Sequence, residues 1–484
     1  MLAGAAEARV RWSTPGAYRL RVTGLSPFAL DARGGDSGQR YLGEHRLRIQ
    51  PMIEAGPVFV QMEIDVLTGQ VFGDPLAVGA AFAERRHGDP QDPYDGWTTV
   101  EPRQLWAEVA TPYATLRLGQ MGSHWGMGLL DNDGEDERDD RWVQRLGDKH
   151  NGDLVDRALV SVRPLRPFTH GAFGDAVLSV GGDHVWEDEL ASALQGDTAW
   201  RIVGSLVWPG DELTAGVYAV HRMQEDEAGE TMTRTAVDLH AQWLLPLFLI
   251  GADVRLQGEV VGLFGETDKV RPATSPEGVE LVGLGWATRA EIAWRCPRVA
   301  TGIEVGYASG DGDPDDDEWR TMSFDPDFRV GLVLFPDVLR LISLRSAERI
   351  ADPARVGVPP GGADLLPTDG SVQNALYLNP GVTWRPGRWT LTAMGVLAWA
   401  AEPFLDPFET FEAGGAPRNH RGERAARFYG VEAAFGVAYA FDLGDLFGAG
   451  VGVQAGGLLP GPALDGGLDD GPIGKVVGRV DLRW

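Results

Sequence analysis

The sequence predicts an all-β protein, a single transmembrane antiparallel up-and-down β-barrel that spans residues 1–484. Two patterns along the chain support this prediction. Segments of about ten residues alternate polar and apolar side chains, and tight turns alternate with long loops between these segments. The chain has no linker, low-complexity spacer or break in composition that would divide it into several domains.

Strict alternation marks the strands, and the end of the chain shows it most clearly. From Lys475 to Trp484, charged side chains dominate one face and apolar side chains fill the other, because successive side chains of a strand point to opposite faces. The same pattern recurs in Glu44–Gln50, Val60–Val66, Thr233–Trp243, Ala252–Val260 and Thr288–Arg295. A barrel strand needs this pattern because only alternate residues meet lipid. For one segment alone, an edge strand of a soluble sandwich is an equal alternative.

The connections predict how many strands there are. Tight turns are expected near Glu54–Pro57, Thr111–Tyr113, Pro164–Phe168, Trp208–Asp211, Leu245–Leu247, Cys296–Arg298, Arg385–Arg388 and Asp442–Asp445. Longer loops are expected near residues 29–42, 72–101, 129–152, 187–197, 225–231, 264–277, 310–369, 402–424 and 460–471. Eight turns and nine loops connect eighteen strands and place both termini at the turn side, which is periplasmic in outer-membrane barrels.

The longest loop, residues 310–369, is expected to fold partly into the lumen and to constrict it. Within it, Phe328–Leu334 has the composition of a strand, and Pro336–Arg345 has that of a short helix with proline in its first turn. The candidate constriction residues are Arg329, Arg340 and Arg345. The alternative is one more hairpin with its turn at Pro336, which would give twenty strands.

Composition excludes several classes of protein. A net charge of −27 repels phosphate backbones, so nucleic acid is not an expected partner. Cys296 is the single cysteine, so the sequence supports neither a disulfide nor a structural zinc site. No apolar run reaches the length of a membrane helix, and residues 1–8 lack the basic start and apolar core of a signal peptide. Enzyme motifs are missing, so no catalytic residue is expected; a hydrolase using Ser123 and His124 is a weaker alternative.

Bases outnumber acids on the predicted inward faces, by fifteen to ten. The bases are Arg19, Arg21, Arg46, Arg48, Arg117, Arg157, Arg163, Arg234, Arg255, Arg289, Arg295, Arg385, Lys475, Arg479 and Arg483. The planar guanidinium group suits bidentate contacts with carboxylate or phosphate. We therefore expect a pore that prefers anionic solutes. The alternative is a ladder of arginine–carboxylate pairs that only stiffens the wall.

Two loops are strongly acidic, Asp131–Asp140 and Ser309–Glu318. Calcium prefers six to eight oxygen ligands, which makes the carboxylates of these loops weak calcium candidates: Asp131, Asp133, Asp311, Asp313 and Asp315. Neither loop has the EF-hand spacing, and a solvated, self-repelling surface loop is the simpler interpretation. No other cofactor is expected.

The closing strand resembles that of bacterial outer-membrane barrels, whose terminal Phe or Trp is recognised by the barrel-assembly machinery; here that residue is Trp484. Two motifs resemble the alginate-export family of outer-membrane porins: Leu116-Arg-Leu-Gly-Gln-Met-Gly-Ser-His-Trp-Gly-Met-Gly128 and Gly306-Tyr-Ala-Ser-Gly-Asp-Gly-Asp-Pro314. The resemblance implies an eighteen-stranded barrel whose basic lumen passes anionic solutes, including polysaccharide.

The expected protein is thus a monomeric channel in the cell outer membrane, surrounded by lipid and lipopolysaccharide. Three alternatives from other classes stay open. One is a surface receptor or adhesin with a plugged lumen, the second is a structural barrel that anchors an envelope complex, and the third is a soluble β-rich binding protein.

Overall fold

The computed structural model describes residues 10–38, 41–74, 78, 97–135, 139–148, 152–169, 171, 174–272, 274–296, 298–313, 316–444, 446–464 and 471–484. Its strands are β1 (Val10–Ser13), β2 (Gly16–Leu25), β3 (Tyr41–Ile49), β4 (Met52–Ala55), β5 (Val58–Gly73), β6 (Val100–Ala110), β7 (Ala114–Gly122), β8 (Leu154–Val162), β9 (Val177–Glu187), β10 (Thr198–Trp208), β11 (Leu213–Glu225), β12 (Thr231–Leu247), β13 (Ala252–Thr267), β14 (Val279–Trp294), β15 (Val299–Ala308), β16 (Glu318–Trp319), β17 (Ala375–Trp384), β18 (Trp389–Phe404), β19 (Ala426–Asp442), β20 (Gly448–Pro460) and β21 (Ile473–Arg483).

The main strands form a closed antiparallel ring. Each pairs with the next main strand along the chain, and β21 pairs back with β2 from Ala17↔Arg483 to Leu25↔Lys475. Among the described residues, β1 and β4 are short extensions of β2 and β3 that pair with each other and, through β4, with β5, and β16 pairs only with β14. The other strands make an eighteen-stranded barrel. The predicted fold class is confirmed, and the alternative of twenty strands is wrong.

Prolines interrupt two strands near the turn side. Pro15 separates β1 from β2, and Pro51 separates β3 from β4, since proline has no N–H to give to a ladder. One predicted turn is misplaced: Leu245–Leu247 belongs to β12, where Leu245 pairs with Val254. The chain reverses instead in the 3-10 turn η3 (Phe248–Ile250). A short run of apolar residues directly before a turn can continue the strand. Hydropathy alone therefore did not locate this turn.

The barrel has an apolar outside and a polar inside. On β12, Val237 and Leu239 are 40% and 51% exposed, whereas Asp238 between them is fully buried. Val476, Val480 and Leu482 of β21 are exposed in the same way, and Arg479 faces the other side. A surface of this kind is stable against hydrocarbon rather than water. No helix in the described part of the chain is long and apolar enough to cross a membrane.

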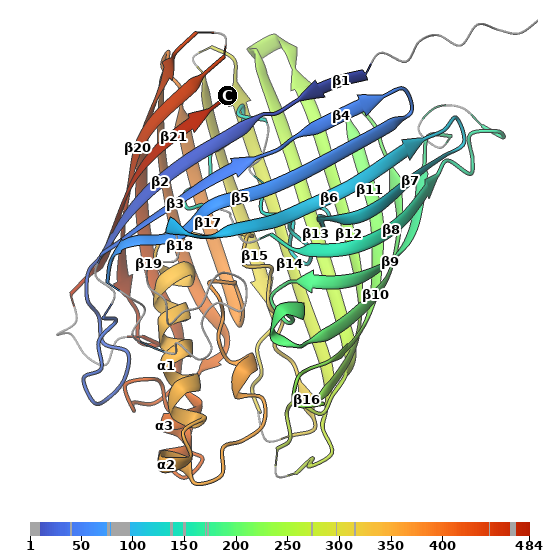
Figure 1. Cartoon of the computed structure of the whole chain (residues 1–484). Coiled ribbons are helices and arrows are strands. Elements are labelled where there is room, and N and C mark those ends of the chain that lie inside the picture. The colour runs from blue at the N-terminus through green and yellow to red at the C-terminus, as the bar shows by residue number, and fades with distance from the viewer. Residues whose placement is uncertain are drawn as a thin grey trace, which may run out of the picture.

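Except for η3 in the turn after β12, the helices gather at the loop end of the barrel, opposite the C-terminus (Figure 1). Most of them come from residues 309–374, between β15 and β17. That loop contains η4 (Leu334–Leu339), α1 (Arg340–Ile350), α2 (Pro353–Val356) and η5 (Ala363–Leu365). The other helices are η2 (Ala193–Gln195), η3 and α3 (Pro407–Glu412). The predicted helix after Pro336 is therefore present, and Phe328–Leu334 is not a strand.

Candidate functional site in the barrel lumen

A short segment of the loop between β7 and β8 runs along the inner wall of the barrel. We call residues 139–148 the inner belt. Its backbone N–H groups donate to wall side chains on β14, β17 and β20 in chain order: Val143 to Glu291 Oε1 at 3.2 Å, Gln144 to Thr383 Oγ1 at 2.9 Å, and Gly147 to Gln454 Oε1 at 3.0 Å. The belt therefore runs around the inner wall from β14 past β17 to β20 and narrows the lumen.

Aromatic and charged contacts hold the first half of the inner belt. Trp142 is 2% exposed and packs with Val143 against Ala293 and Ala300. The guanidinium of Arg255 lies 4.6 Å from the centre of the Trp142 ring, within the range of a cation–π contact. The belt is thus a packed part of the interior rather than a solvated loop.

The second half of the belt ends on a cluster of arginines where the barrel closes. The Asp148 carboxylate accepts hydrogen bonds from Arg19 at 3.3 Å, Arg21 at 3.2 Å and Arg479 at 2.6 Å. Burial raises the pKa of Asp148, but Arg21, Arg479 and Arg19 outweigh burial and hold that pKa well below its ordinary value. Asp148 is therefore a permanent anion in this place.

The barrel register explains why these arginines converge. Arg21 lies directly opposite Arg479 on β21, and Arg19 lies directly opposite Arg46 on β3. Like charges placed opposite each other destabilise a sheet, so the cluster needs anions. Within the described part of the chain, Nη1 of Arg46 is buried without a hydrogen-bond partner. We call Arg19, Arg21, Arg46 and Arg479 the seam cluster.

Most other predicted inward arginines are paired with carboxylates. These pairs are Arg48–Asp65 at 2.7 Å, Arg157–Asp183 at 2.7 Å, Arg234–Glu189 at 3.1 Å, Arg255–Glu291 at 2.5 Å, Arg289–Glu304 at 2.7 Å, Arg295–Asp253 at 2.7 Å and Arg117–Glu108. Arg163 follows the end of β8 and is exposed, as is Arg483 at the end of β21. Arg385 donates to the Trp142 carbonyl oxygen at 2.9 Å, and Lys475 contacts Asp337 at 2.7 Å.

A second anchor holds the start of the same loop. The carboxylate of Glu259 on β13 accepts from the N–H groups of Met127 and Leu129, the latter at 3.0 Å. Gly126 makes this approach feasible: its φ is +58°, and a Cβ there would lie 2.1 Å from the Glu259 carboxylate. Asp238, on the neighbouring strand, shares this inner face and is fully buried. The glycine-rich motif thus serves the docking of the loop.

The acidic residues singled out in the sequence lie in different surroundings. Asp131 is buried and accepts from Ser123 at 2.8 Å, Arg201 at 3.0 Å and Tyr218 at 2.7 Å. Asp133 lies 3.5 Å from His124. Of the other three candidates, Asp313 donates its N–H to the carboxylate of Asp311 at 3.0 Å, and Asp315 lies outside the described residues.

Three other acids, which the sequence analysis did not single out, lie together. Carboxylate oxygens of Asp153, Glu189 and Asp325 lie within 4.8 Å of one another. They come from three separate loops, so no spacing in the sequence could indicate the group. Glu189 pairs with Arg234 at 3.1 Å, and Asp325 accepts from the N–H of Asp327 at 2.7 Å. These carboxylates are thus part of the network that holds the loops.

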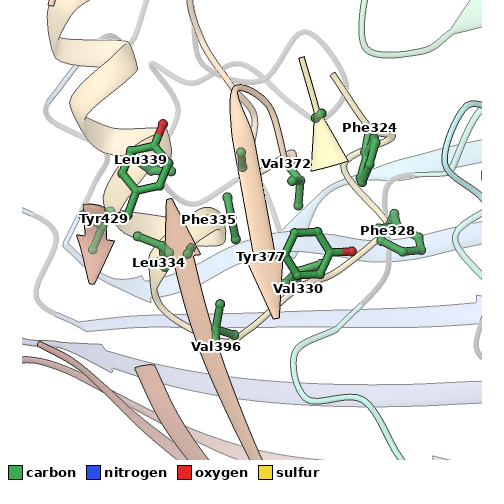
Figure 2. Close-up of a cluster of buried hydrophobic side chains, with 14 of the residues drawn as sticks. Phe324, Phe328, Val330, Leu334, Phe335, Leu339, Val372, Tyr377, Val396 and Tyr429 are labelled. Atoms are coloured by element: carbon green, nitrogen blue, oxygen red, sulfur yellow. The ribbon is translucent and has the colours of Figure 1, made fainter. Parts of the chain in front are cut away.

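The long loop 309–374 forms a second layer on the loop side of the belt. Glu432 of β19 accepts from three consecutive N–H groups, those of Leu332 at 2.5 Å, Val333 at 3.2 Å and Leu334 at 2.8 Å. Figure 2 shows the apolar side chains of this loop against Tyr377, Val396 and Tyr429 of the wall. The layer is therefore fixed by both hydrogen bonds and apolar packing.

The predicted constriction arginines hold this layer together. Arg329 lies 3.7 Å from Asp327, and Arg345 bonds to Asp31 at 2.9 Å and to Glu348 at 2.7 Å. Arg340 begins α1. Arg345 therefore ties α1 to the loop between β2 and β3, a contact between loops that the sequence did not predict.

Open space next to the belt reaches the seam. A cavity of about 90 Å³ lies between Gln144 and Leu146 of the belt and the wall of β18 to β21, where Arg479 and Asp481 line it. The sequence prediction placed the constriction in residues 310–369 and missed the belt. The Trp142–Val143 pair, apolar residues within an acidic loop, was the available signal.

No protein-family model matches the sequence, and no curated protein matches it. Solved structures do resemble it. OccD3 (OpdP) from Pseudomonas aeruginosa has a TM-score of 0.54 at 9% identity, covering 100% of this chain and 93% of its own. OccK11 (OpdR) from the same organism has a TM-score of 0.51 at 9% identity, covering 98% and 95%. OccAB1 from Acinetobacter baumannii has a TM-score of 0.50 at 11% identity, covering 97% and 96%. The fold is that of an outer-membrane β-barrel.

Proposed function

We propose that the protein is an outer-membrane channel through which small anionic solutes diffuse. The observation that carries the proposal is the seam cluster, in which four arginines from three adjacent strands face the narrowed lumen beside an open cavity. Guanidinium groups in a confined, low-dielectric passage attract carboxylates more strongly than they do in water. The similarity in fold to Occ and Opd channels is consistent with this role.

A small solute fits the lumen better than a polymer. Two loop layers occupy the interior, and the space beside the belt is a cavity of about 90 Å³. The resemblance to alginate-export porins gains no support from the three solved structures named above, which are Occ and Opd proteins. We therefore place alginate and other polysaccharides behind small carboxylates as the proposed cargo.

Ion selectivity tests the proposal. The purified protein, inserted into planar bilayers under a KCl gradient, should show a reversal potential that reports chloride preferred over potassium. A clear preference for potassium would contradict the proposed selectivity. As a control, Arg163→Gln removes a base beyond the end of β8 and should leave the reversal potential unchanged.

A second candidate function has its own observation. Loop 309–374 buries a continuous apolar cluster against β17, β18 and β19 (Figure 2), as a plug would. A surface receptor or an anchor for an envelope complex would use such a closed lumen. The absence of any conductance from correctly folded protein in bilayers would favour this candidate over the channel.

The pairing of Trp484 at the end of the closing strand bears on how the barrel is assembled. Trp484 exchanges two backbone hydrogen bonds with Gly16, N–H to O at 3.1 and 3.0 Å, and its ring lies over that glycine. We propose that the assembly machinery contacts Trp484 before this pairing forms, because the ring and its backbone groups are engaged by β2 once the barrel has closed.

A further inference from the structure

The seam cluster already contains a ligand, and that ligand belongs to the chain itself. Asp148 presents a carboxylate to three guanidinium groups from β2 and β21, at 2.6 to 3.3 Å. Its side chain is 4% exposed. This is the coordination that a carboxylate solute would receive if it reached the same place.

Charge counting shows that the cluster is built for an anion beyond those of the wall. Among the described residues, the wall itself pairs Arg19 with Asp481 at 2.9 Å and Arg21 with Glu44 at 2.6 Å. Asp481 also contacts Arg479, so these two wall carboxylates serve three of the four arginines, and Nη1 of Arg46 stays buried without a hydrogen-bond partner. Asp148 supplies the missing negative charge from outside the wall.

Local geometry allows Asp148 to leave. It is carried by a loop rather than a strand, and Gly147 before it has a φ of +87° with nothing within 4 Å of a built Cβ. Arg479 and Asp481 line the cavity of about 90 Å³. A cavity of that volume can hold several water molecules and is therefore large enough for one carboxylate group.

We propose that Arg19, Arg21, Arg46 and Arg479 form a carboxylate-binding site in the channel, and that Asp148 is its built-in occupant, which a carboxylate solute displaces as it passes the inner belt. The inference rests on the proposed function and deepens it. Asp148 makes the site specific for anions, because a solute can displace it only by replacing its contacts with the arginines. A neutral solute that displaced Asp148 would leave the arginines without a negative partner.

The test compares Asp148→Asn with a matched variant. Asp139→Asn makes the same change of charge in the same belt, but Asp139 pairs with Arg141 and lies away from the seam. If the internal carboxylate fills the site for more than nine-tenths of the time, its removal strengthens binding of an external carboxylate by at least about 10-fold. Sodium acetate is the probe, titrated against single-channel current and, separately, by calorimetry in detergent.

We expect Asp148→Asn to bind acetate at least about 10-fold more tightly than the wild-type protein, and Asp139→Asn to match the wild type. Asp148→Glu keeps a carboxylate on a longer side chain and should restore weak binding; it also shows that the position tolerates substitution. Equal acetate affinity in Asp148→Asn and Asp139→Asn would overturn the inference, as would equal strengthening for a neutral probe such as glucose.

Calorimetry separates this inference from the proposed function. If the wild-type protein shows no anion preference in bilayers, the proposed selectivity is refuted. If Asp148→Asn nevertheless binds acetate in calorimetry, the carboxylate-binding site is still established. Inorganic phosphate binding more tightly than acetate would overturn the assignment to carboxylates.

Discussion

Replacing Glu432 with glutamine should release the loop layer formed by residues 309–374. The carboxylate accepts three consecutive N–H groups, from Leu332, Val333 and Leu334. Glutamine keeps one acceptor oxygen and turns an NH₂ group toward donors, so at least one bond is lost and the others become neutral. A bond to a charged acceptor contributes about 1.5–3 kcal/mol and a neutral one about 1 kcal/mol. We expect a loss of at least about 2.5 kcal/mol, or about a 70-fold shift in the equilibrium between docked and released loop.

Limited proteolysis of the folded barrel measures this equilibrium, and single-channel noise reports it independently. Cleavage within residues 309–374 should accelerate by about 70-fold. Glu402→Gln is the control, because its pair with Arg427 is exposed and contributes at most about 1 kcal/mol. A cleavage rate of Glu432→Gln no faster than that of Glu402→Gln would refute the argument that these three bonds hold the loop.

Three further predictions concern stability and the closure of the barrel. Burial lowers the pKa of His420 to about 3, so the unfolded chain binds the extra proton below pH 6.5, and acidification from pH 8 to pH 5 should cost about 2 kcal/mol. Thermal unfolding should show this loss in the wild type and not in His420→Asn. Gly126→Ala should lower the unfolding midpoint more than Gly171→Ala, because both have positive φ but only the first adds a clash. Gly16→Val should slow closure of the barrel, seen as unfolded protein by gel mobility, since its side chain would occupy the place of the Trp484 ring.

The wall of the barrel could be predicted from the sequence because its information is local. Alternation fixes which residues of β21 face lipid, and the order of short and long connections fixes the parity of the ring. Leu245–Leu247 is the exception: an apolar run next to a turn has no alternation to locate its end, and the structure continues β12 through it.

The interior could be predicted only in part. The helix after Pro336 follows from a local signal, the proline at its start. The path of the inner belt does not, because the partners of Val143 and Asp148 lie more than one hundred residues away in the chain. Pairing of inward arginines was foreseen as an alternative, yet which carboxylate meets which guanidinium depends on strand register, and no single segment encodes register.

The order of synthesis sets a constraint on how the interior is finished. The inner belt lies between β7 and β8, but the surfaces that it touches, from β14 to β21, are made from residues that follow it in the chain. Its last contact needs both ends of the ring, since Asp148 binds β2 and β21 together. The belt therefore cannot reach its final position before the ring closes. Once in place, it links the first and last strands of the barrel to the strands from β14 to β20.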